Sequence, residues 1–266
     1  MTAELRDEPE NDEAMSFWEH LEELRRRLIY MLASFVVGAG VAWMVRERLL
    51  YWLTTPFAAA WGEAALGGTA ALHFPAPQSL FVAYMKLSLI SGLIFSLPIL
   101  LYQLWAFVSP GLYSREKRYA IPFVVSSCGL FALGAWFGWR FAFPAAFRYL
   151  LSFSGKLGPN IVVEPAVMVD EYIEFVSRLL LAFGAVFELP VLVFFLAIAG
   201  LVNHTHLIKF FRVFVVIAFI ISAIITPPDP LSQLILAIPL CGLYGISIGV
   251  AYLFGKREPA ETAITK

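Results

Sequence analysis

Charged residues are scarce in this sequence. Only 15% of its 266 residues are charged and 60% are hydrophobic, with a mean hydropathy of +0.76, whereas a soluble domain has about 25% charged and about 45–50% apolar residues. A core of this size cannot hide such an apolar surplus, which excludes a water-soluble globule. Nineteen basic and 20 acidic residues leave a net charge of −1, so the chain also lacks the basic surface of a nucleic-acid-binding protein. The composition predicts an integral membrane protein.

Cysteine and histidine are also rare, and their positions exclude several kinds of site. Cys128 and Cys241 both lie inside apolar runs, where a small packing residue is expected rather than a disulfide framework. All four histidines fall outside the apolar runs, which argues against a haem held by two membrane histidines and against a Ser–His membrane protease. We therefore expect no catalytic residue, no metal site and no cofactor, and the chain is not predicted to be an enzyme.

Long uncharged runs predict the fold. A helix needs about 20 apolar residues to cross about 30 Å of hydrocarbon. Six runs between charges qualify as spans: Leu28–Val45, Leu87–Ser114, Tyr119–Trp139, Leu179–Val202, Val213–Thr226 and Leu231–Gly255. The fifth is short, because the uncharged stretch from Val213 to Ile225 makes only about 20 Å of helix. The sequence predicts an all-α membrane protein whose six spans leave both termini on one side.

The basic residues indicate which side that is. Twelve of the 19 lie on the side of the termini, and the positive-inside rule then places both termini in the cytoplasm.

On the other side, the segments at about 46–86 and 140–178 keep many aromatic and aliphatic residues, so we expect ordered caps at the interface. Residues 1–14 carry six acids and one base, which is typical of a disordered tail. They lack the features of a secretory signal, so we expect the first span to be retained, and 256–266 form a second short tail.

One carboxylate lies within an apolar run. Glu188 stands about ten residues inside the fourth run, where a charged side chain costs at least about 2.5 kcal/mol and is usually functional. The alternative is a neutral, protonated side chain that donates one hydrogen bond between helices. Pro190 lacks a backbone donor and should bend the helix beside it.

Polar residues also gather where the fifth run meets the sixth. Thr226 opens a proline-rich turn that includes Asp229, and Gln233 follows at the start of the sixth run. Polar groups at membrane depth must face protein or water. Two interpretations stay equally open here: a plain helical hairpin with a stiff turn, and a docking face for another membrane helix.

The cytoplasmic end of the first span has a pattern of its own. Phe17, Leu21, Leu24 and Leu28 recur at helical spacing, which predicts an amphipathic helix lying on the membrane before the span. Its carboxylates, and Glu116 after the second span, would each alone be ordinary solvated charges. Two acidic sites on one cytoplasmic surface could nevertheless hold a guanidinium-bearing ligand in bidentate fashion.

Four motifs occur in a fixed order along the chain. They are His20–Leu28 (HLEELRRRL), Leu97–Tyr113 (LPILLYQLWAFVSPGLY) followed by Glu116, Phe183–Pro190 (FGAVFELP), and Thr226–Gln233 (TPPDPLSQ) leading to Ala237–Pro239. Together they cover about residues 15–255, and they resemble the TatC family, the core subunit of the twin-arginine protein translocase.

The resemblance implies a concave, glove-like bundle of six helices with short fifth and sixth spans, in the bacterial cytoplasmic (inner) membrane. It implies binding of twin-arginine signal peptides of folded cargo, single-span TatA- and TatB-type partners, transport driven by the proton-motive force, and self-association in a larger complex. Its implied sites are Glu23, Arg25 and Glu116 for the signal peptide, Glu188 within the membrane, and Thr226 and Gln233 for a partner helix. Pro56, Pro98, Pro110, Pro190 and Asp229 are expected to shape the fold.

One position departs from the family. The chain has Gly245 where the family often has an acidic residue, so any role of that acid is absent or relocated. The lack of a transit peptide favours a bacterial or archaeal source over a plastid one.

The alternative function is a proton- or ion-coupled small-solute transporter that uses Glu188 as its titrating group. Carriers commonly contain repeats, however, and this sequence shows none. A structural scaffold comes third.

Overall fold

The structure is a computed structural model that describes residues 17–64, 68–108, 120–156, 159–198, 200–226 and 229–255. Within them, six helical segments are long and apolar enough to cross a membrane: Trp18–Met44, Pro77–Phe107, Ile121–Leu151, Val169–Ile198, His204–Ile225 and Pro230–Phe254. The predicted six spans are confirmed. The last two have 22 and 25 residues against 27 to 31 in the others, so they are indeed the shortest. Both predicted tails, Pro110 and Glu116 lie outside the described residues.

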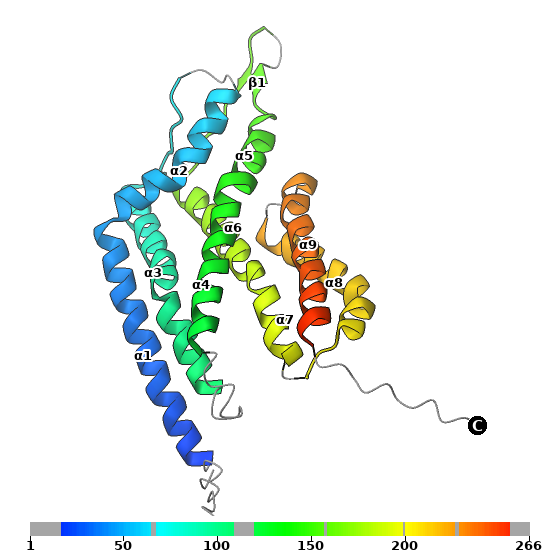
Figure 1. Cartoon of the computed structure of the whole chain (residues 1–266). Helices are drawn as coiled ribbons and strands as arrows, with labels where there is room; N and C mark the ends of the chain where they lie inside the picture. The colour runs from blue at the N-terminus through cyan, green and yellow to red at the C-terminus, as the bar shows by residue number, and fades with distance from the viewer. Residues whose placement is uncertain are drawn as a thin grey trace, which may run out of the picture.

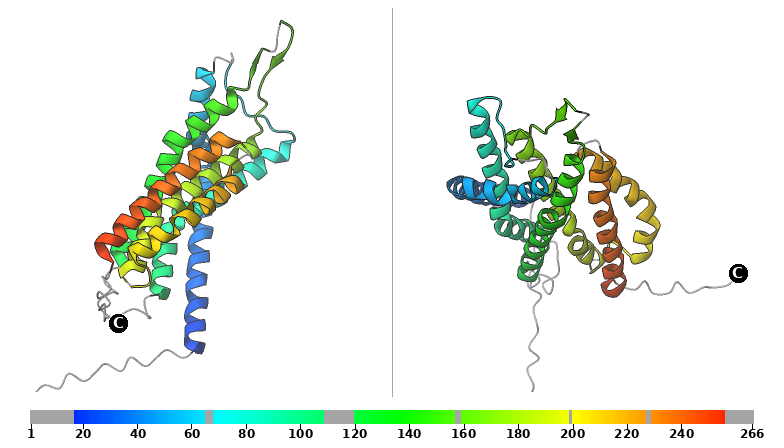
Figure 2. Two further views of the ribbon diagram at one scale, coloured as in Figure 1. Left: turned by 90° about the vertical axis from the view of Figure 1, so that its right-hand side faces the viewer. Right: turned by 90° about the horizontal axis from the view of Figure 1, so that it is seen from above.

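The helices form a curved assembly rather than a closed ring (Figures 1 and 2). The pair α1 and α3 stands at one edge and the pair α8 and α9 at the other, with α4 to α7 between them. The described elements are α1 (Phe17–Met44), α2 (Arg46–Glu63), α3 (Pro77–Val108), α4 (Ala120–Phe137), the π-helical turn η3 (Gly138–Ala142), α5 (Phe143–Leu151), β1 (Gly155–Lys156), β2 (Val162–Val163), α6 (Val169–Phe187), α7 (Leu189–Ile198), α8 (His204–Ile225) and α9 (Pro230–Phe254). The start of α1 and the end of α9 point to the same end of the bundle (Figure 1).

The first helix corrects one prediction. Residues 17–28 form no separate helix on the membrane surface, because α1 runs unbroken from Phe17 to Met44. Its first turns pack against the end of α3, where the rings of His20 and Phe107 stack at 4.6 Å between centroids. Deeper in the membrane the two backbones nearly touch, since a Cβ on Gly92 would lie 2.5 Å from the Ala39 nitrogen. Contact with α3 therefore holds this segment in line with the span.

The third span is longer than predicted. The helix does not end near Trp139 but continues to Leu151 through η3. Pro144 has no N–H to continue the α-helical ladder, and the preceding residue, Phe143, bonds instead to the Gly138 carbonyl. This π-helical turn carries the chain past the proline, and the extension packs Phe147 against Phe57 of α2 with 5.5 Å between ring centroids.

Helices α2 and α5 and the hairpin β1–β2 cap one end of the bundle (Figure 1). Tyr172 at the start of α6 donates a hydrogen bond of 2.9 Å to the Leu53 carbonyl, and Arg148 of α5 pairs with Glu63 of α2 at 2.9 Å. A single bridge joins His73 to the segment before α6, with 2.9 Å between the His73 nitrogen and the Val167 oxygen. The described parts of both segments are therefore ordered, as the sequence predicts.

Prolines mark several features of the helices. Helix α6 ends at Phe187, Glu188 forms the turn, and α7 begins at Leu189 with Pro190 as its second residue. Pro56 and Pro98 lie inside α2 and α3. Asp229 caps α9, because its Oδ1 accepts a hydrogen bond of 2.7 Å from the Ser232 nitrogen, which satisfies one of the free donors at a helix start.

Candidate functional site

A charged pair lies at the start of α1, on the side that meets α3. Glu23 and Arg27 are one helical turn apart, and only 9% and 16% of their side chains are exposed. Arg27 Nε lies 2.9 Å from Glu23 Oε1, and Arg27 Nη2 contacts the same oxygen. Arg27 Nη1 donates across to Oε1 of Gln103 on α3 at 3.3 Å. The structure thus holds one guanidinium group between a carboxylate and a side-chain amide.

The other oxygen of this carboxylate, Glu23 Oε2, is buried and has no hydrogen-bond partner in the described part of the chain. Beside it is a hollow of about 460 Å³, lined by Glu19, Glu22, Glu23, Arg25, Arg26 and Ile29. The structure therefore brings the predicted residues Glu23 and Arg25 to one surface. A buried carboxylate with a free oxygen is suited to binding a guanidinium group.

The intramembrane carboxylate lies between α4 and the α6–α7 break. Glu188 is half-buried, and the buried Ser127 hydroxyl of α4 faces its carboxyl group. Neither Ser127 Oγ nor Glu188 Oε1 makes a hydrogen bond of normal length within the described ranges. Trp105 of α3 is similar, since its buried Nε1 also lacks a described partner while its ring stacks on Phe123 at 4.8 Å. This region carries polar groups with unused hydrogen-bonding capacity.

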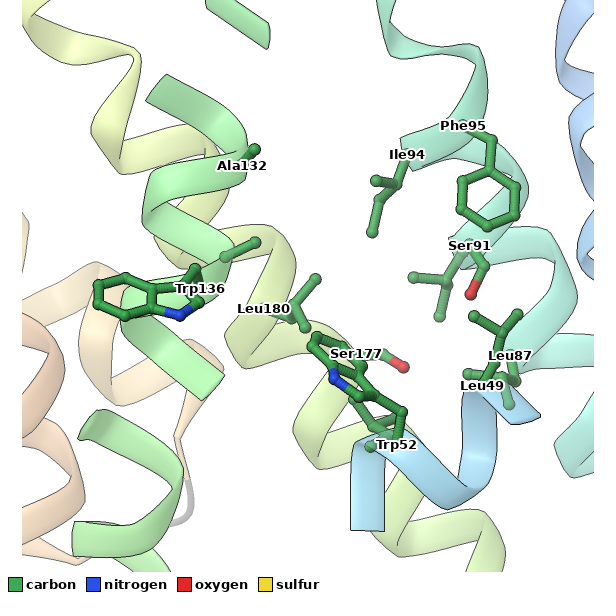
Figure 3. Close-up of a pocket in the computed structure, with 13 residues that line it drawn as sticks. Leu49, Trp52, Leu87, Ser91, Ile94, Phe95, Ala132, Trp136, Ser177 and Leu180 are labelled. Atoms are coloured by element: carbon green, nitrogen blue, oxygen red, sulfur yellow. The ribbon is translucent and has the colours of Figure 1, made fainter. Parts of the chain in front are cut away.

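A separate cavity of about 370 Å³ opens between α2, α3, α4 and α6 (Figure 3). Its wall is apolar apart from Ser91 and Ser177, and Figure 3 shows Trp136 of α4 across from Ser91 of α3, with Trp52 of α2 below them. Glu188 is not among the residues that line this cavity. Sequence reasoning missed this cavity, because its residues come from four distant helices and share no motif.

The predicted partner-docking residues are engaged inside the α8–α9 hairpin. Thr226 is only 5% exposed, and its hydroxyl donates to the Ser222 carbonyl at 2.9 Å. The Gln233 amide nitrogen donates to the Phe219 carbonyl across the hairpin at 3.0 Å. Helix α8 instead presents an exposed apolar stripe at helical spacing: Val213, Val216, Ile220 and Ile224. Any docking surface at this edge is therefore mainly apolar, a feature that the polar residues alone did not indicate.

Comparison with known proteins places the chain in a family. The model of a family described as Sec-independent protein translocase protein (TatC) matches residues 19–239. The chain belongs to the TatC family. A TatC protein of Desulforapulum autotrophicum is 41% identical over 250 residues, which is 94% of this chain and 89% of that protein. A TatC protein of Campylobacter jejuni is 41% identical over 229 residues, covering 86% and 90%.

Solved structures agree with this assignment. Two crystal structures of the twin-arginine translocase receptor TatC, one of them in the detergent DDM, superpose on this chain with TM-scores of 0.75 and 0.76 at 39% identity. They cover 88% and 90% of this chain, and the matches span 98% and 100% of the solved chains. The chain thus has the TatC fold of six membrane helices. Glu23, Glu188 and Gln233 all lie within the range that the family model matches, whereas Gly245 lies beyond it.

Proposed function

We propose that this TatC-family protein is the membrane receptor and core of a twin-arginine translocase. It binds the twin-arginine signal peptides of folded proteins and, with TatA- and TatB-type subunits, supports their transport across the bacterial cytoplasmic membrane by the proton-motive force. The observation that carries the proposal is the buried Glu23 carboxylate, which lines a hollow at the start of α1 and whose second oxygen has no described hydrogen-bond partner. The names of its relatives supply the kind of ligand.

The signal-peptide site combines residues from two elements. Glu23 and Arg25 lie on α1, and Gln103 near the end of α3 adds an amide oxygen beside Glu23. Glu116, which follows α3 in the sequence and lies outside the described residues, would supply the second carboxylate. The excess of basic residues on the side of the termini supports a cytoplasmic location for this surface, where a signal peptide would arrive. The proposed function requires no chemical step by the protein, only binding and assembly.

Photo-crosslinking of a labelled signal peptide tests this function. We expect a photoreactive residue placed at Ile29, which lines the hollow, to capture an Arg-Arg peptide in inverted membrane vesicles. The matched Lys-Lys peptide should give little adduct, because an ammonium group cannot form the planar bidentate pair of a guanidinium. Equal capture of the two peptides would refute a twin-arginine receptor.

We further propose that the α8–α9 edge receives the transmembrane helix of a TatB-type partner, near Thr226 and Gln233. The exposed stripe on α8 gives such a helix an apolar surface, and close packing drives helix association in membranes. In a variant without Cys128 and Cys241, single cysteines at Val216 and Ile220 should crosslink to cysteines in the partner helix in resting membranes.

The control for these crosslinks is a cysteine at Val36, an exposed apolar position on α1 at the opposite edge of the bundle. It should give little product. Crosslinks confined to α1 and α4 would place the docking surface elsewhere.

A further inference from the structure

We propose that Arg27 competes with the signal peptide for its binding site. In the resting protein its guanidinium group occupies the position that a signal-peptide arginine takes on binding, so that binding is an exchange of one arginine for another. This inference rests on the proposed function and concerns how the same site selects its ligand.

The contacts of Arg27 are those expected of a bound arginine ligand. Its Nε and Nη2 both meet Glu23 Oε1, and its Nη1 reaches Gln103 Oε1 at 3.3 Å. A guanidinium group carries five N–H donors in a rigid plane, and here that plane connects an acceptor on α1 to an acceptor on α3. Neither Arg25 nor Arg26 pairs with Glu23 among the described residues, and both are exposed. Arg27 alone therefore holds the ligand position.

Burial makes an exchange necessary. Both carboxylate oxygens are covered: Oε1 contacts Arg27, and Oε2 is buried without a described partner. An incoming guanidinium cannot reach either oxygen unless a side chain moves, and Arg27 has a long, flexible stem. If Arg27 left without a replacement, the buried carboxylate would lose its counter-ion, which is strongly unfavourable. Departure of Arg27 and entry of another cation are therefore coupled.

The exchange discriminates between arginine and lysine. An incoming arginine can restore each contact that Arg27 gives up and can also pair with Glu23 Oε2, which Arg27 leaves without a described partner, so the exchange favours the peptide. A lysine ammonium is a compact point charge that cannot present a planar fork to Glu23 and Gln103 together. Replacement of Arg27 by a peptide lysine therefore costs free energy. This cost is what excludes a Lys-Lys peptide from the site.

The test compares two peptides on two proteins. Arg27→Lys keeps the charge at this position but weakens the resident contacts. In full-length protein in lipid nanodiscs, we expect it to raise the affinity for an Arg-Arg signal peptide by about threefold to tenfold, because less of the protein is held in the occupied state. The affinity for the Lys-Lys peptide should rise by a similar factor, because both peptides displace the same resident side chain, and it should stay below the affinity for the Arg-Arg peptide. Arg212→Lys, the same change at an exposed position on α8, should leave both affinities unchanged.

Each other result has a definite meaning. A lower or unchanged affinity for the Arg-Arg peptide would show that Arg27 merely supports the helix and would overturn the inference alone. If the wild-type protein itself does not prefer the Arg-Arg peptide, the proposed function is refuted, and the inference that rests on it is refuted as well. Should Arg27→Lys not fold, Arg27→Gln, which keeps an amide donor toward Glu23, allows the same comparison, and the same results would support or overturn the inference.

Discussion

A Glu23→Gln variant is expected to bind a twin-arginine peptide about tenfold to a hundredfold more weakly than the wild-type protein. Charge-assisted hydrogen bonds contribute roughly 1.5–3 kcal/mol each, and about 1.4 kcal/mol corresponds to a tenfold change in affinity. Glu23 is only 9% exposed, so water screens its charge poorly and the effect should lie toward the upper end. Glutamine keeps a carbonyl oxygen for Arg27, which spares the fold. Peptide titrations in nanodiscs, together with thermal unfolding of each variant, would measure both effects.

Two further variants complete this test. Glu116→Ala should weaken binding about tenfold if that side chain reads the second arginine, by the same relation between free energy and affinity. Glu22→Gln changes the neighbouring carboxylate on α1, which is exposed, and should cost about twofold or less, because exposed ion pairs contribute little. Unchanged binding by Glu23→Gln, by Glu116→Ala and by the double variant would refute the assignment of this site.

The fold could be predicted largely because each helix that crosses a membrane needs a minimum number of apolar residues without charges. Uncharged runs identified all six spans, and the first turn of α9 follows a pattern of Asp229 and Pro230 that is typical of helix starts. The ends of the spans could not be predicted in this way. Helices α3 and α6 each begin about ten residues before the uncharged run. In these additional turns, Lys86 of α3 donates a hydrogen bond of 3.1 Å to the carboxylate of Glu174 on α6. Charges that pair with each other do not end a helix, and a single sequence does not show which charges pair.

The candidate site shows the same limit more sharply. Glu23 could be selected from a motif. Gln103 could not, because it lies 80 positions further along the chain and nothing in the sequence indicates that both side chains accept hydrogen bonds from Arg27. The amphipathic spacing at residues 17–28 pointed to the membrane surface, yet His20 and Arg27 of this segment contact α3 while Leu21 and Leu28 stay exposed. Periodicity of apolar residues therefore did not identify the side of the helix that packs. For the same reason, the sequence did not show that the Thr226 hydroxyl and the Gln233 amide nitrogen already donate to carbonyls of α8.

The second large effect is expected at Glu188, where glutamine and alanine should differ. Glu188→Gln keeps a donor and an acceptor at the α6–α7 turn and should retain most of the transport of a folded twin-arginine reporter in membrane vesicles. Glu188→Ala removes both, and leaving a buried partner unsatisfied costs about 1–3 kcal/mol, so transport should fall about tenfold. Both variants should still bind the signal peptide, since Glu23 lies in another part of the fold. Ser127→Ala, which removes the hydroxyl that faces this carboxyl, should have an intermediate effect.

This comparison also separates the receptor from a proton-coupled carrier. A carrier needs a group that takes up and releases a proton, which glutamine cannot do, so Glu188→Gln would be as inactive as Glu188→Ala. A hydrogen-bonding role needs only a polar side chain of the same shape, because a neutral carboxyl and an amide can each donate and accept. The open hydrogen-bonding capacity of Glu188, Ser127 and Trp105 favours this second role, in which a polar group of an incoming helix completes the site. If the glutamine variant transports no better than the alanine variant, Glu188 titrates during transport and its hydrogen-bonding role is refuted.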